Sequence, residues 1–248
     1  MKTLSLLWSI ASEIYHTNSE YVFLKNLLKP NYRIHDSSFG SGFPMINLYK
    51  DNFKNISCSD IDEGNLNILE RKQEILKISF PHFKSSFKEL PKNVFTKCDI
   101  VLCIGSSLSY CDSWDDEIKE VSSFNEGIIE SILGMRSILN KNGKLIIGNS
   151  KLYQKSKSQD LIEFEEIVID NHSYKMNWHL NYDWMNFKKS WTCVIMKDGY
   201  KKFDVKLISH LFNEDDLKKM CSSVFHNVEM IYPIGDVPEY YLICQEPK

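Results

Sequence analysis

Glycine and proline are scarce in this 248-residue sequence, with 10 and 7 residues respectively. Their scarcity excludes a collagen-like or low-complexity chain, and the near balance of 30 basic against 33 acidic residues excludes a polyelectrolyte tail. Hydrophobic residues make up 43% of the chain, so it can bury the core of one large domain, or of one domain with a sizeable insertion. We therefore expect an ordinary soluble, folded protein.

Arginine is also scarce, because Arg33, Arg71 and Arg136 are the only three in the sequence. No arginine follows Arg136, so a bidentate guanidinium clamp on a carboxylate or phosphate has to come from the earlier part of the chain. The net charge is -3, and the sequence has no run of basic residues with interleaved aromatics. These two features predict that the protein has no nucleic-acid partner.

The sequence also lacks long apolar runs and any Cys-x-x-Cys motif. The apolar run at residues 4–11 is too short to span a membrane and has no signal-peptide cleavage site after it, so it predicts an amphipathic first helix. The seven cysteines are an odd number, and most of them lie in apolar, strand-like runs. This pattern predicts reduced, buried cysteines in a cytoplasmic protein, without a disulfide framework or a metal site.

From residue 20 to about residue 150, helix and strand patterns alternate. Helices are predicted over 21–28, 43–50, 61–76 and 124–139, and strands over 33–39, 56–60, 98–104 and 144–150. Asn142-Gly143 is predicted to form the turn that ends the last of these helices. Strands and helices that alternate with short connections predict a doubly wound parallel α/β sheet, which binds its ligands at the carboxyl ends of the strands.

After residue 150 the pattern becomes that of successive strands. Between residues 174 and 184, aromatic and apolar residues alternate strictly with polar ones, which predicts a strand with one aromatic face. Two more strands are predicted over 191–196 and 203–208, joined by a turn at Asp198-Gly199. A helix capped by Asn213 and a closing hairpin of residues 228–234 and 240–245 are expected to follow.

The most informative motif is Asp36-Ser37-Ser38-Phe39-Gly40-Ser41-Gly42, which follows the first predicted strand, while Asp60 ends the second. Glycines at a strand-to-helix turn let a ligand approach the backbone, and an acidic residue that ends the next strand accepts the hydroxyls of a ribose. Together they predict a nucleoside site. Met45 stands where a dinucleotide site would need its third glycine, and Asp36 would repel a pyrophosphate but suits a cation such as an amino-acid ammonium group.

Four segments carry a resemblance to a known family: Asp36-x-x-x-Gly40-x-Gly42, Asp60, residues 98–109 and residues 142–147. Together they resemble class I S-adenosylmethionine-dependent methyltransferases, and most closely the glycine/sarcosine N-methyltransferase-like branch. The resemblance covers about residues 10–150 and, more loosely, residues 237–241. It implies a Rossmann-like sheet, mostly parallel with an antiparallel last strand, and an antiparallel β insertion after strand five.

We expect three parts in this chain. They are an S-adenosylmethionine-binding core with N-terminal helices over 1–154, the antiparallel β insertion over 155–208 that covers the acceptor site, and a C-terminal helix and hairpin over 209–248 that complete the core sheet.

The resemblance also implies roles for individual residues. Asp36, Gly40, Ser41 and Gly42 are expected to surround the methionine part of the cofactor, and Asp60 to bind its ribose. Ser86 and Phe87 are expected at the adenine, and Ile104, Gly105 and Ser106 beneath the sulfonium. Ile61 is expected to contact the cofactor as well. Ser107, Tyr110 and Asn149 are expected to face the methyl acceptor as catalytic residues. Alternatively, Ser86, Phe87 and Tyr110 have no role in binding, and are an ordinary loop serine and two aromatic residues that pack in the core.

Two departures from the family pattern bear on activity. Ser37-Ser38-Phe39 replaces the small or apolar residues that usually precede the glycines, so the cofactor loop could be shaped differently. Ser150 stands where glycine-methylating enzymes carry an arginine that binds the substrate carboxylate, and only Lys151 or Asn149 could partly compensate. Glycine is therefore a doubtful substrate.

Methyl transfer from S-adenosylmethionine needs an oriented, neutral nucleophile, and a strong base only for an alcohol acceptor. His35 and His179 fall in no recognisable acid–base arrangement, so N-methylation of a small-molecule amine is favoured. The alternatives are O-methylation of a small molecule, such as a sugar or natural-product hydroxyl, and a catalytically silent subunit that binds a nucleoside or a protein partner. A membrane partner is not expected, and homo-oligomerisation stays open.

Two further segments each have two interpretations. The aromatic face of residues 174–184 either packs on the sheet or a subunit interface, or lines an acceptor pocket with Trp178, Tyr182 or Trp184. The acidic run at 112–120 is either a solvated loop or a lid over the tip of strand four.

Overall fold

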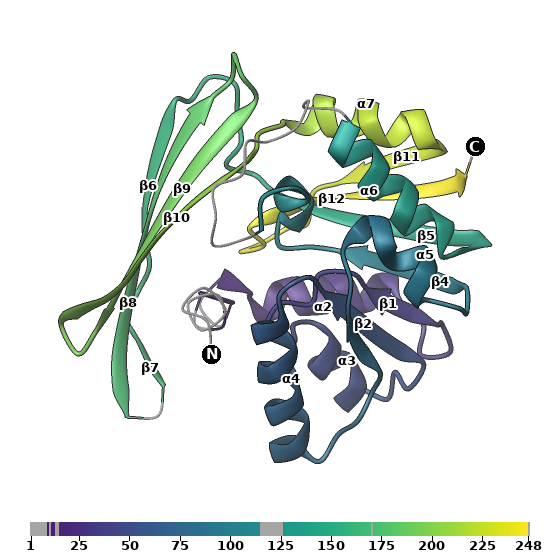
Figure 1. The fold of residues 1–248 in the computed structure, drawn as a ribbon, viewed down its shortest axis with the longest axis horizontal. Helices are drawn as coiled ribbons and strands as arrows, with labels where there is room; N and C mark the ends of the chain where they lie inside the picture. The colour runs from purple at the N-terminus through teal and green to yellow at the C-terminus, as the bar shows by residue number, and fades with distance from the viewer. Residues whose placement is uncertain (1–8, 10, 13–14, 115–125, 170, 248) are drawn as a thin grey trace.

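Two β-sheets organise the chain in the computed structural model, which describes residues 9, 11–12, 15–114, 126–169 and 171–247 (Figure 1). One sheet has seven strands in the order β11-β12-β5-β4-β1-β2-β3, and the other has the order β10-β9-β8-β6, with β7 paired to β8. Most of the predicted first helix, most of the acidic run at 112–120 and the start of the predicted helix 124–139 lie outside the described residues. No helix of the described part is long and apolar enough to span a bilayer.

The seven-stranded sheet has the doubly wound arrangement expected from the alternating pattern. Its strands are β1 (Ile34–Asp36), β2 (Ile56–Asp60), β3 (His82–Lys84), β4 (Cys98–Cys103), β5 (Leu139–Ser150), β11 (Phe225–Ile231) and β12 (Glu239–Pro247). Pairs β1–β2, β1–β4, β2–β3 and β4–β5 are parallel, whereas β12 is antiparallel to both β5 and β11. The predicted mostly parallel sheet with an antiparallel last strand is confirmed.

Helices cover both faces of this sheet (Figure 1). They are α2 (Asn18–Leu27), α3 (Met45–Lys50), α4 (Glu63–Leu76), α5 (Leu90–Asn93), α6 (Glu126–Ser137) and α7 (Glu214–Val224), with short 3-10 turns η1 (Phe87–Glu89) and η2 (Ser107–Tyr110). Side chains of β4 alternate between two apolar clusters: Val101 and Cys103 pack toward α6 and α7, and Ile100 and Leu102 toward α2 and α3. The nearly continuous apolar sequence of β4 thus reflects burial on both faces.

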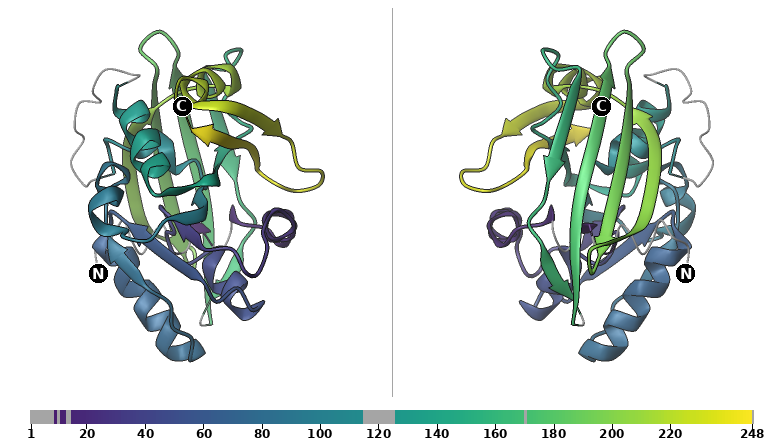
Figure 2. Two further views of the ribbon diagram at one scale, coloured as in Figure 1. Left: turned by 90° about the vertical axis from the view of Figure 1, so that its right-hand side faces the viewer. Right: turned by 90° about the vertical axis from the view of Figure 1, so that its left-hand side faces the viewer.

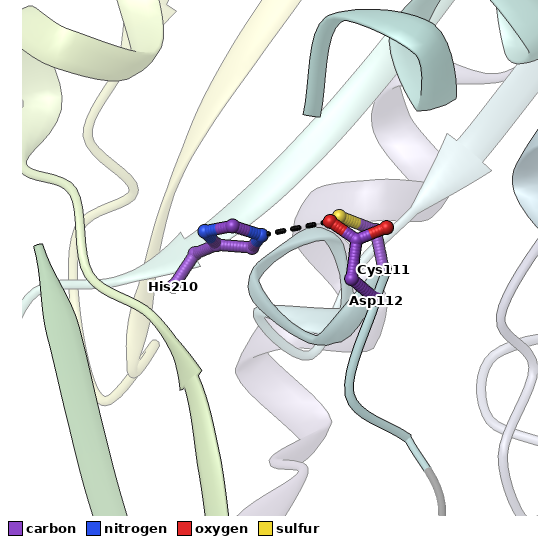
Figure 3. A group of neighbouring side chains, drawn as sticks. All are labelled: Cys111, Asp112 and His210. Carbon is purple, nitrogen blue, oxygen red and sulfur yellow. Dashed lines mark hydrogen bonds and ion pairs between the residues drawn. The ribbon is translucent and has the colours of Figure 1, made fainter. Parts of the chain in front are cut away.

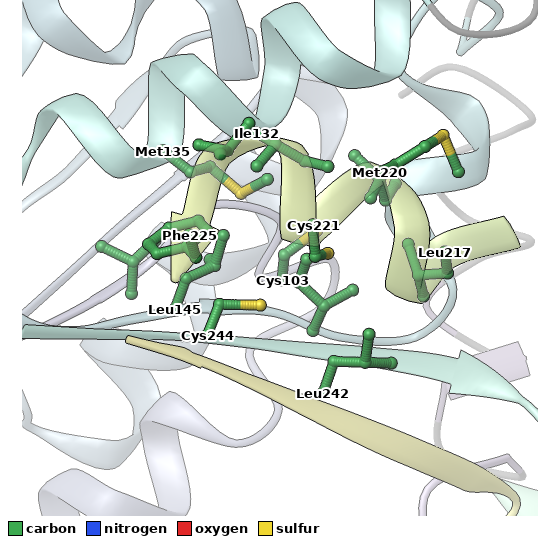
Figure 4. Close-up of a cluster of buried hydrophobic side chains, with 14 of the residues drawn as sticks. Cys103, Ile132, Met135, Leu145, Leu217, Met220, Cys221, Phe225, Leu242 and Cys244 are labelled. Carbon is green, nitrogen blue, oxygen red and sulfur yellow. The ribbon is translucent and has the colours of Figure 1, made fainter. Parts of the chain in front are cut away.

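The cluster beneath α6 and α7 is rich in sulfur. Figure 4 shows Cys103 and Cys244 from the sheet below Met135 of α6 and Cys221 of α7. All seven cysteines are free, and all except Cys111 are buried, which agrees with the sequence prediction. The side chain of Asn213 accepts from the Asp216 amide in a capping box at the start of α7, as its position before this helix predicts.

The second sheet is formed by β6 (Gln159–Glu163), β7 (Ile167–Ile169), β8 (His172–Asp183), β9 (Lys188–Lys197) and β10 (Tyr200–His210). All of its strand pairings among the described residues are antiparallel, so the predicted β insertion after strand five is confirmed. Its long strands stand beside the core sheet (Figure 2, green). Met176, Trp178, Leu180 and Tyr182 of β8 are buried, and this inner face packs against Tyr15, Tyr110 and Tyr153.

Two local predictions differ from the structure. Asn142-Gly143 lies inside β5 and not in a turn, because α6 already ends at Ser137. The ladder with β4 shifts register there, since Cys98 pairs with Leu139 but Ile100 pairs with Lys144, and this shift absorbs the extra residues. Strand β3 was not predicted, because it has only three residues and lies at the edge of the sheet.

Candidate functional site

Two pockets adjoin at the carboxyl end of β4. The first pocket is lined by Ser37, Ser38, Asp60, Ile61, Asn65, Ser85, Ser86, Phe87, Gly105, Ser107, Tyr110, Cys111 and Trp114. The second pocket is lined by Tyr15, Gly105, Ser106, Tyr110, Ser150, Leu152, Tyr153, Trp178, Leu180 and Trp191. Gly105 and Tyr110 belong to both pockets, so molecules bound in the two would meet at the tip of β4.

Two buried carboxylates lie at the ends of β1 and β2, beside the first pocket. Asp36 Oδ1 accepts from the Ser38 amide at 3.0 Å, and its Oδ2 is buried without a hydrogen-bond partner among the described residues. Asp60 Oδ2 accepts from the Gly40 amide at 3.0 Å, and Oδ1 accepts from the Asp62 amide at 2.8 Å. These bonds hold the glycine loop against the end of β2, where Gly40 has a φ of 56° that a glycine adopts without strain.

Burial sets the protonation of both groups. It raises the pKa of Asp36 to about 8, with a smaller contribution from the nearby Asp60. Burial likewise raises the pKa of Asp60 to about 7, against the opposing effect of its two backbone amide donors. Two buried carboxylates, one with an unpaired oxygen, favour a ligand that brings positive charge or hydrogen-bond donors.

The far end of the first pocket is built by η1 and by α4. Ser86 precedes η1 and its hydroxyl donates to Glu89 Oε2 at 2.9 Å, while Phe87 lines the pocket directly. Trp114 Nε1 donates to Asp62 Oδ2 at 3.3 Å, which ties the segment after η2 to the N-terminal cap of α4. Serine hydroxyls and aromatic faces at this end suit a flat heterocycle.

The tip of β4 is held by the buried carboxyl of Glu239 from β12. Gly105 and Ser106 both have positive φ, at 68° and 55°, so the chain turns sharply between the two pockets. The Gly105 amide donates to Glu239 Oε2 at 3.2 Å, and the Ser106 hydroxyl donates to Oε1 at 3.3 Å. Burial, and secondarily the negative charge of Glu20, raise the pKa of Glu239.

The second pocket is mainly aromatic. Tyr15 stacks on Trp178 with ring centroids 5.4 Å apart, and Trp178 meets Trp191 edge to face at 5.5 Å. The Nε1 atom of Trp178 is buried without an acceptor among the described residues. The aromatic face of residues 174–184 had two interpretations. Trp178, Tyr182 and Trp184 all pack in the cluster beneath the second sheet, as the first interpretation predicts. Only Trp178 also lines a pocket, because Tyr182 and Trp184 line neither of the two.

The structure brings most of the expected site residues together. Asp60, Ile61, Ser86, Phe87, Gly105, Ser107 and Tyr110 line the first pocket, and Ser106 lines the second. Asp36 and Gly40 support the first pocket through the bonds described above. Ile104 is buried in the core behind β4.

Besides Ile104, three expected residues lie away from both pockets. Ser41 and Gly42 line a separate groove on the other side of the glycine loop. Asn149 lines neither the first nor the second pocket, because its amide donates to Tyr240 Oη at 2.8 Å on the opposite face of β5 from Ser150. Neighbouring residues of a strand point to opposite faces, so Ser150, which stands in the place of the family's arginine, is the one that reaches the second pocket.

The sequence analysis also missed residues that matter here, among them Tyr15, Tyr153, Lys189 and Glu239. For Lys189 a signal existed: it lies two residues before Trp191 and four before Cys193, so it shares the inward face of β9. A lysine on an apolar strand face is unusual enough to be noted. Tyr15 and Glu239 come from opposite ends of the chain; no local pattern marks Tyr15, and the loose resemblance over residues 237–241 assigned no role to Glu239.

His35 and His179 have no catalytic arrangement in the structure. His35 is buried between the hydroxyls of Ser57 and Ser59, at 2.9 and 3.0 Å, and burial lowers its pKa to about 3. His179 is exposed on the outer face of β8.

A third histidine belongs to a cluster with Cys111 and Asp112 (Figure 3). His210 Nε2 lies 3.0 Å from Asp112 Oδ2, and the candidate ligand atoms of the three residues lie within 4.8 Å of one another. The Lys88 ammonium also lies 3.2 Å from Asp112 Oδ1, so the carboxylate is already paired with a cation. In this arrangement the cluster ties β10 to η2.

Comparisons with known proteins bear on the fold. No protein-family model matches the sequence, and no curated protein matches it. Among solved structures, an S-adenosylmethionine-dependent methyltransferase from Clostridium acetobutylicum has 16% identity and a TM-score of 0.62, over 92% of this chain and 90% of its own. The amino pentose methyltransferase CalS10 from Micromonospora echinaspora, solved with S-adenosylmethionine bound, has 8% identity and a TM-score of 0.69, over 96% of both chains.

A third similar structure is the sugar N-methyltransferase KedS8 from Streptoalloteichus, with 12% identity and a TM-score of 0.69, over 100% of this chain and 94% of its own. At such identities the likeness shows the fold alone. The chain therefore has the class I fold of S-adenosylmethionine-dependent methyltransferases, including the antiparallel sheet after β5.

Proposed function

We propose that this protein is an S-adenosylmethionine-dependent methyltransferase that methylates a small molecule at an amine. The observation that carries the proposal is the pair of adjoining pockets at the tip of β4, which share Gly105 and Tyr110. One pocket is bordered by buried carboxylates, and the other is aromatic and covered by the second sheet. A methyl donor in the first pocket and an acceptor in the second would meet at Gly105.

The residues that line the first pocket, and Asp36 beside it, fit the cofactor. The unpaired Oδ2 of Asp36 suits the ammonium group of the methionine part, and the second lone pairs of the Asp60 oxygens suit the ribose hydroxyls. Ile61, Ser86 and Phe87 would hold the adenine. When bound, S-adenosylmethionine supplies a methyl group on a positively charged sulfur. The chain's part is to hold an acceptor lone pair in line with that methyl and to keep water out.

The lining of the second pocket favours an amine over a hydroxyl. It contains no His, Asp or Glu among the described residues, so a base in direct contact with an alcohol proton is missing from it. It also contains no cation for a substrate carboxylate: Lys151 Nζ donates to Val237 O at 2.9 Å, and Asn149 faces away. The glycine/sarcosine branch is therefore a resemblance of the core, and an acceptor without a carboxylate, such as an amino sugar, is the better candidate.

The first test is calorimetric titration of the purified protein with S-adenosylhomocysteine, with NAD as the control ligand. We expect S-adenosylhomocysteine to bind and NAD not to bind, because Met45 and Asp36 oppose a pyrophosphate. Binding of neither ligand would contradict the proposal and favour the silent-subunit alternative. After binding is established, product analysis with paired amino and hydroxy sugars separates N-methylation from O-methylation.

Replacement of Asp60 tests the cofactor site. Asp60→Ala removes hydrogen bonds between a charged group and the ribose, worth about 1.5 to 3 kcal/mol, so S-adenosylhomocysteine should bind roughly tenfold to a hundredfold more weakly. Asp60→Asn keeps one oxygen for the Gly40 or Asp62 amide and should fall in between. Asp215→Ala, an exposed carboxylate on α7, is the matched control. Unchanged affinity in Asp60→Ala would contradict the assignment.

A further inference from the structure

A fully buried lysine lies behind the wall of the second pocket. Lys189 of β9 has no exposed surface, and its Nζ donates a hydrogen bond to Tyr153 Oη. Tyr153 itself lines the second pocket and also interacts with the hydroxyl of Ser106. Lys189 is therefore one hydrogen bond away from whatever occupies the pocket.

The surroundings of Lys189 are aromatic and hold no paired carboxylate. Its Nζ lies 4.3 Å from the ring centroid of Tyr153 and 4.8 Å from that of Tyr110. Its strand partners are Tyr182 on β8 and Ser209 on β10. Beyond Tyr182 lies Asp160, whose Oδ2 accepts a hydrogen bond from Tyr182 Oη at 2.9 Å and which also pairs with Lys157.

Among the described residues no carboxylate forms an ion pair with Lys189. The titratable groups that face Lys189 are thus Tyr110, Tyr153 and Tyr182, with Glu239 beyond Ser106.

These contacts leave the two protonation states of Lys189 close in energy. Burial without a counter-ion disfavours the ammonium form and lowers the pKa of Lys189 to about 7. The two tyrosine rings favour the ammonium form through cation–π attraction. A group that accepts and releases a proton near neutral pH needs this balance, whereas a lysine that served only to fill space could be replaced by an apolar residue.

We propose that Lys189, acting through the Tyr153 hydroxyl, takes the proton that an ammonium acceptor has to lose before its nitrogen can be methylated in the second pocket. The inference rests on the proposed function and assigns its acceptor class, an amine that arrives protonated. An N–H bond of the ammonium breaks as its proton passes to Tyr153 Oη, and the Tyr153 O–H bond breaks as that proton passes to neutral Lys189 Nζ. The freed lone pair then attacks the methyl group. Lys189 returns its proton along the same route to water after the product leaves.

Tyr153 is the catalytic residue in this proposal because it contacts the acceptor, and Lys189 is a positioning residue that acts through it. Three variants separate this role from others. Lys189→Met keeps the volume without the nitrogen, Lys189→Arg keeps a positive charge that cannot be released, and Tyr153→Phe removes the link. Lys188→Met, the same change at the neighbouring exposed lysine of β9, is the matched control.

The experiment measures the pH profile of single-turnover methyl transfer to an amine found in the acceptor screen. We expect the wild-type rate to rise with pH and level off above neutrality, where neutral Lys189 can take the proton. All three variants should lose that step and about a hundredfold of the plateau rate. Lys188→Met should match the wild type. If Lys189→Arg transfers the methyl group as fast as the wild type, the site needs only a positive charge and the relay is wrong. An unchanged pH profile in Lys189→Met or Tyr153→Phe would also overturn the relay.

A second measurement does not depend on turnover. The isotope-labelled Cε resonance of Lys189, assigned by its loss in Lys189→Arg, should titrate near neutral pH in the wild type and shift in Tyr153→Phe. Titration in the ordinary range of lysine, about 10 to 11, would overturn the inference even if no acceptor is turned over. Calorimetry with S-adenosylhomocysteine separates the two hypotheses: its failure in the wild type contradicts the proposed function, whereas binding with an unperturbed Lys189 contradicts only the relay.

Discussion

The Asp36→Asn variant is expected to lose less stability than the wild type as pH rises, when no ligand is bound. The same substitution should weaken binding of the cofactor. In the wild type, the Asp36 carboxyl is buried with its Oδ2 atom unpaired, and burial raises its pKa to about 8. Asparagine has a similar shape and keeps an oxygen for the Ser38 amide, but it carries no charge. The variant therefore removes the titration and leaves the local hydrogen bond.

The direction of the pH effect follows from proton binding. A carboxyl whose pKa is raised in the folded state binds a proton on folding, so its contribution is fully present below the unfolded pKa and is lost as pH rises through the folded pKa. For Asp36, the loss runs at about 1.4 kcal/mol per pH unit from about pH 4 up to about pH 8. Between about pH 6 and about pH 8, the stability of Asp36→Asn should thus gain about 2 kcal/mol relative to that of the wild type.

Chemical denaturation at these two pH values measures the effect, with Asp215→Asn, an exposed carboxylate, as the control. S-adenosylhomocysteine should bind Asp36→Asn at least about tenfold more weakly, because an ammonium–carboxylate bond is lost. Parallel stability profiles for variant and wild type would show that Asp36 does not titrate in this range. If Asp36→Asn binds S-adenosylhomocysteine more weakly but unfolds less readily than the wild type, Asp36 serves binding at the expense of stability.

The parts of the fold that the sequence predicts are those in which local pattern and tertiary environment agree. Strand β4 is apolar except for Asp99 because both of its faces are covered, and β8 alternates because only one of its faces is covered. Asp60 could be placed at the site because it ends a strand, and the carboxyl ends of parallel strands meet at one edge. Each of these features depends on a pattern within one strand, which can be read from the sequence alone.

The second pocket could not be predicted in this way. Its lining residues Tyr15, Tyr153 and Trp191 lie in three separate parts of the chain and meet only after the second sheet folds against the tip of β4. Asn149 shows the same limit at the scale of one residue, because the pleat of β5 turns Ser150 toward the pocket and Asn149 away from it. Strand register, which sequence patterns fix only loosely, decides which neighbour is functional.

Gly134→Ala is expected to destabilise the protein and to disturb the first pocket, although alanine favours helices. A Cβ atom at Gly134 of α6 would lie 2.1 Å from the carbonyl oxygen of Phe87 and 3.1 Å from Cα of Lys88. Both contacts are with backbone, so a side-chain rotation cannot relieve them and η1 has to move. Intrinsic helix propensity gains about 1 kcal/mol from the change, whereas overpacking against backbone typically loses about 1 to 3 kcal/mol.

We expect overpacking to win, because η1 is also tied to its surroundings through Lys88 and Phe87. Lys88 forms ion pairs with Glu130 of α6 at 2.8 Å and with Asp112 at 3.2 Å, and Phe87 lines the first pocket. Displacement of η1 should therefore lower both the free energy of unfolding and the affinity for S-adenosylhomocysteine. Leu133→Ala, at the neighbouring position that is 40% exposed, should change neither much. The opposite result would be a Gly134→Ala variant that is more stable than the wild type and binds S-adenosylhomocysteine equally well. It would show that α6 can move away from η1 without changing the first pocket.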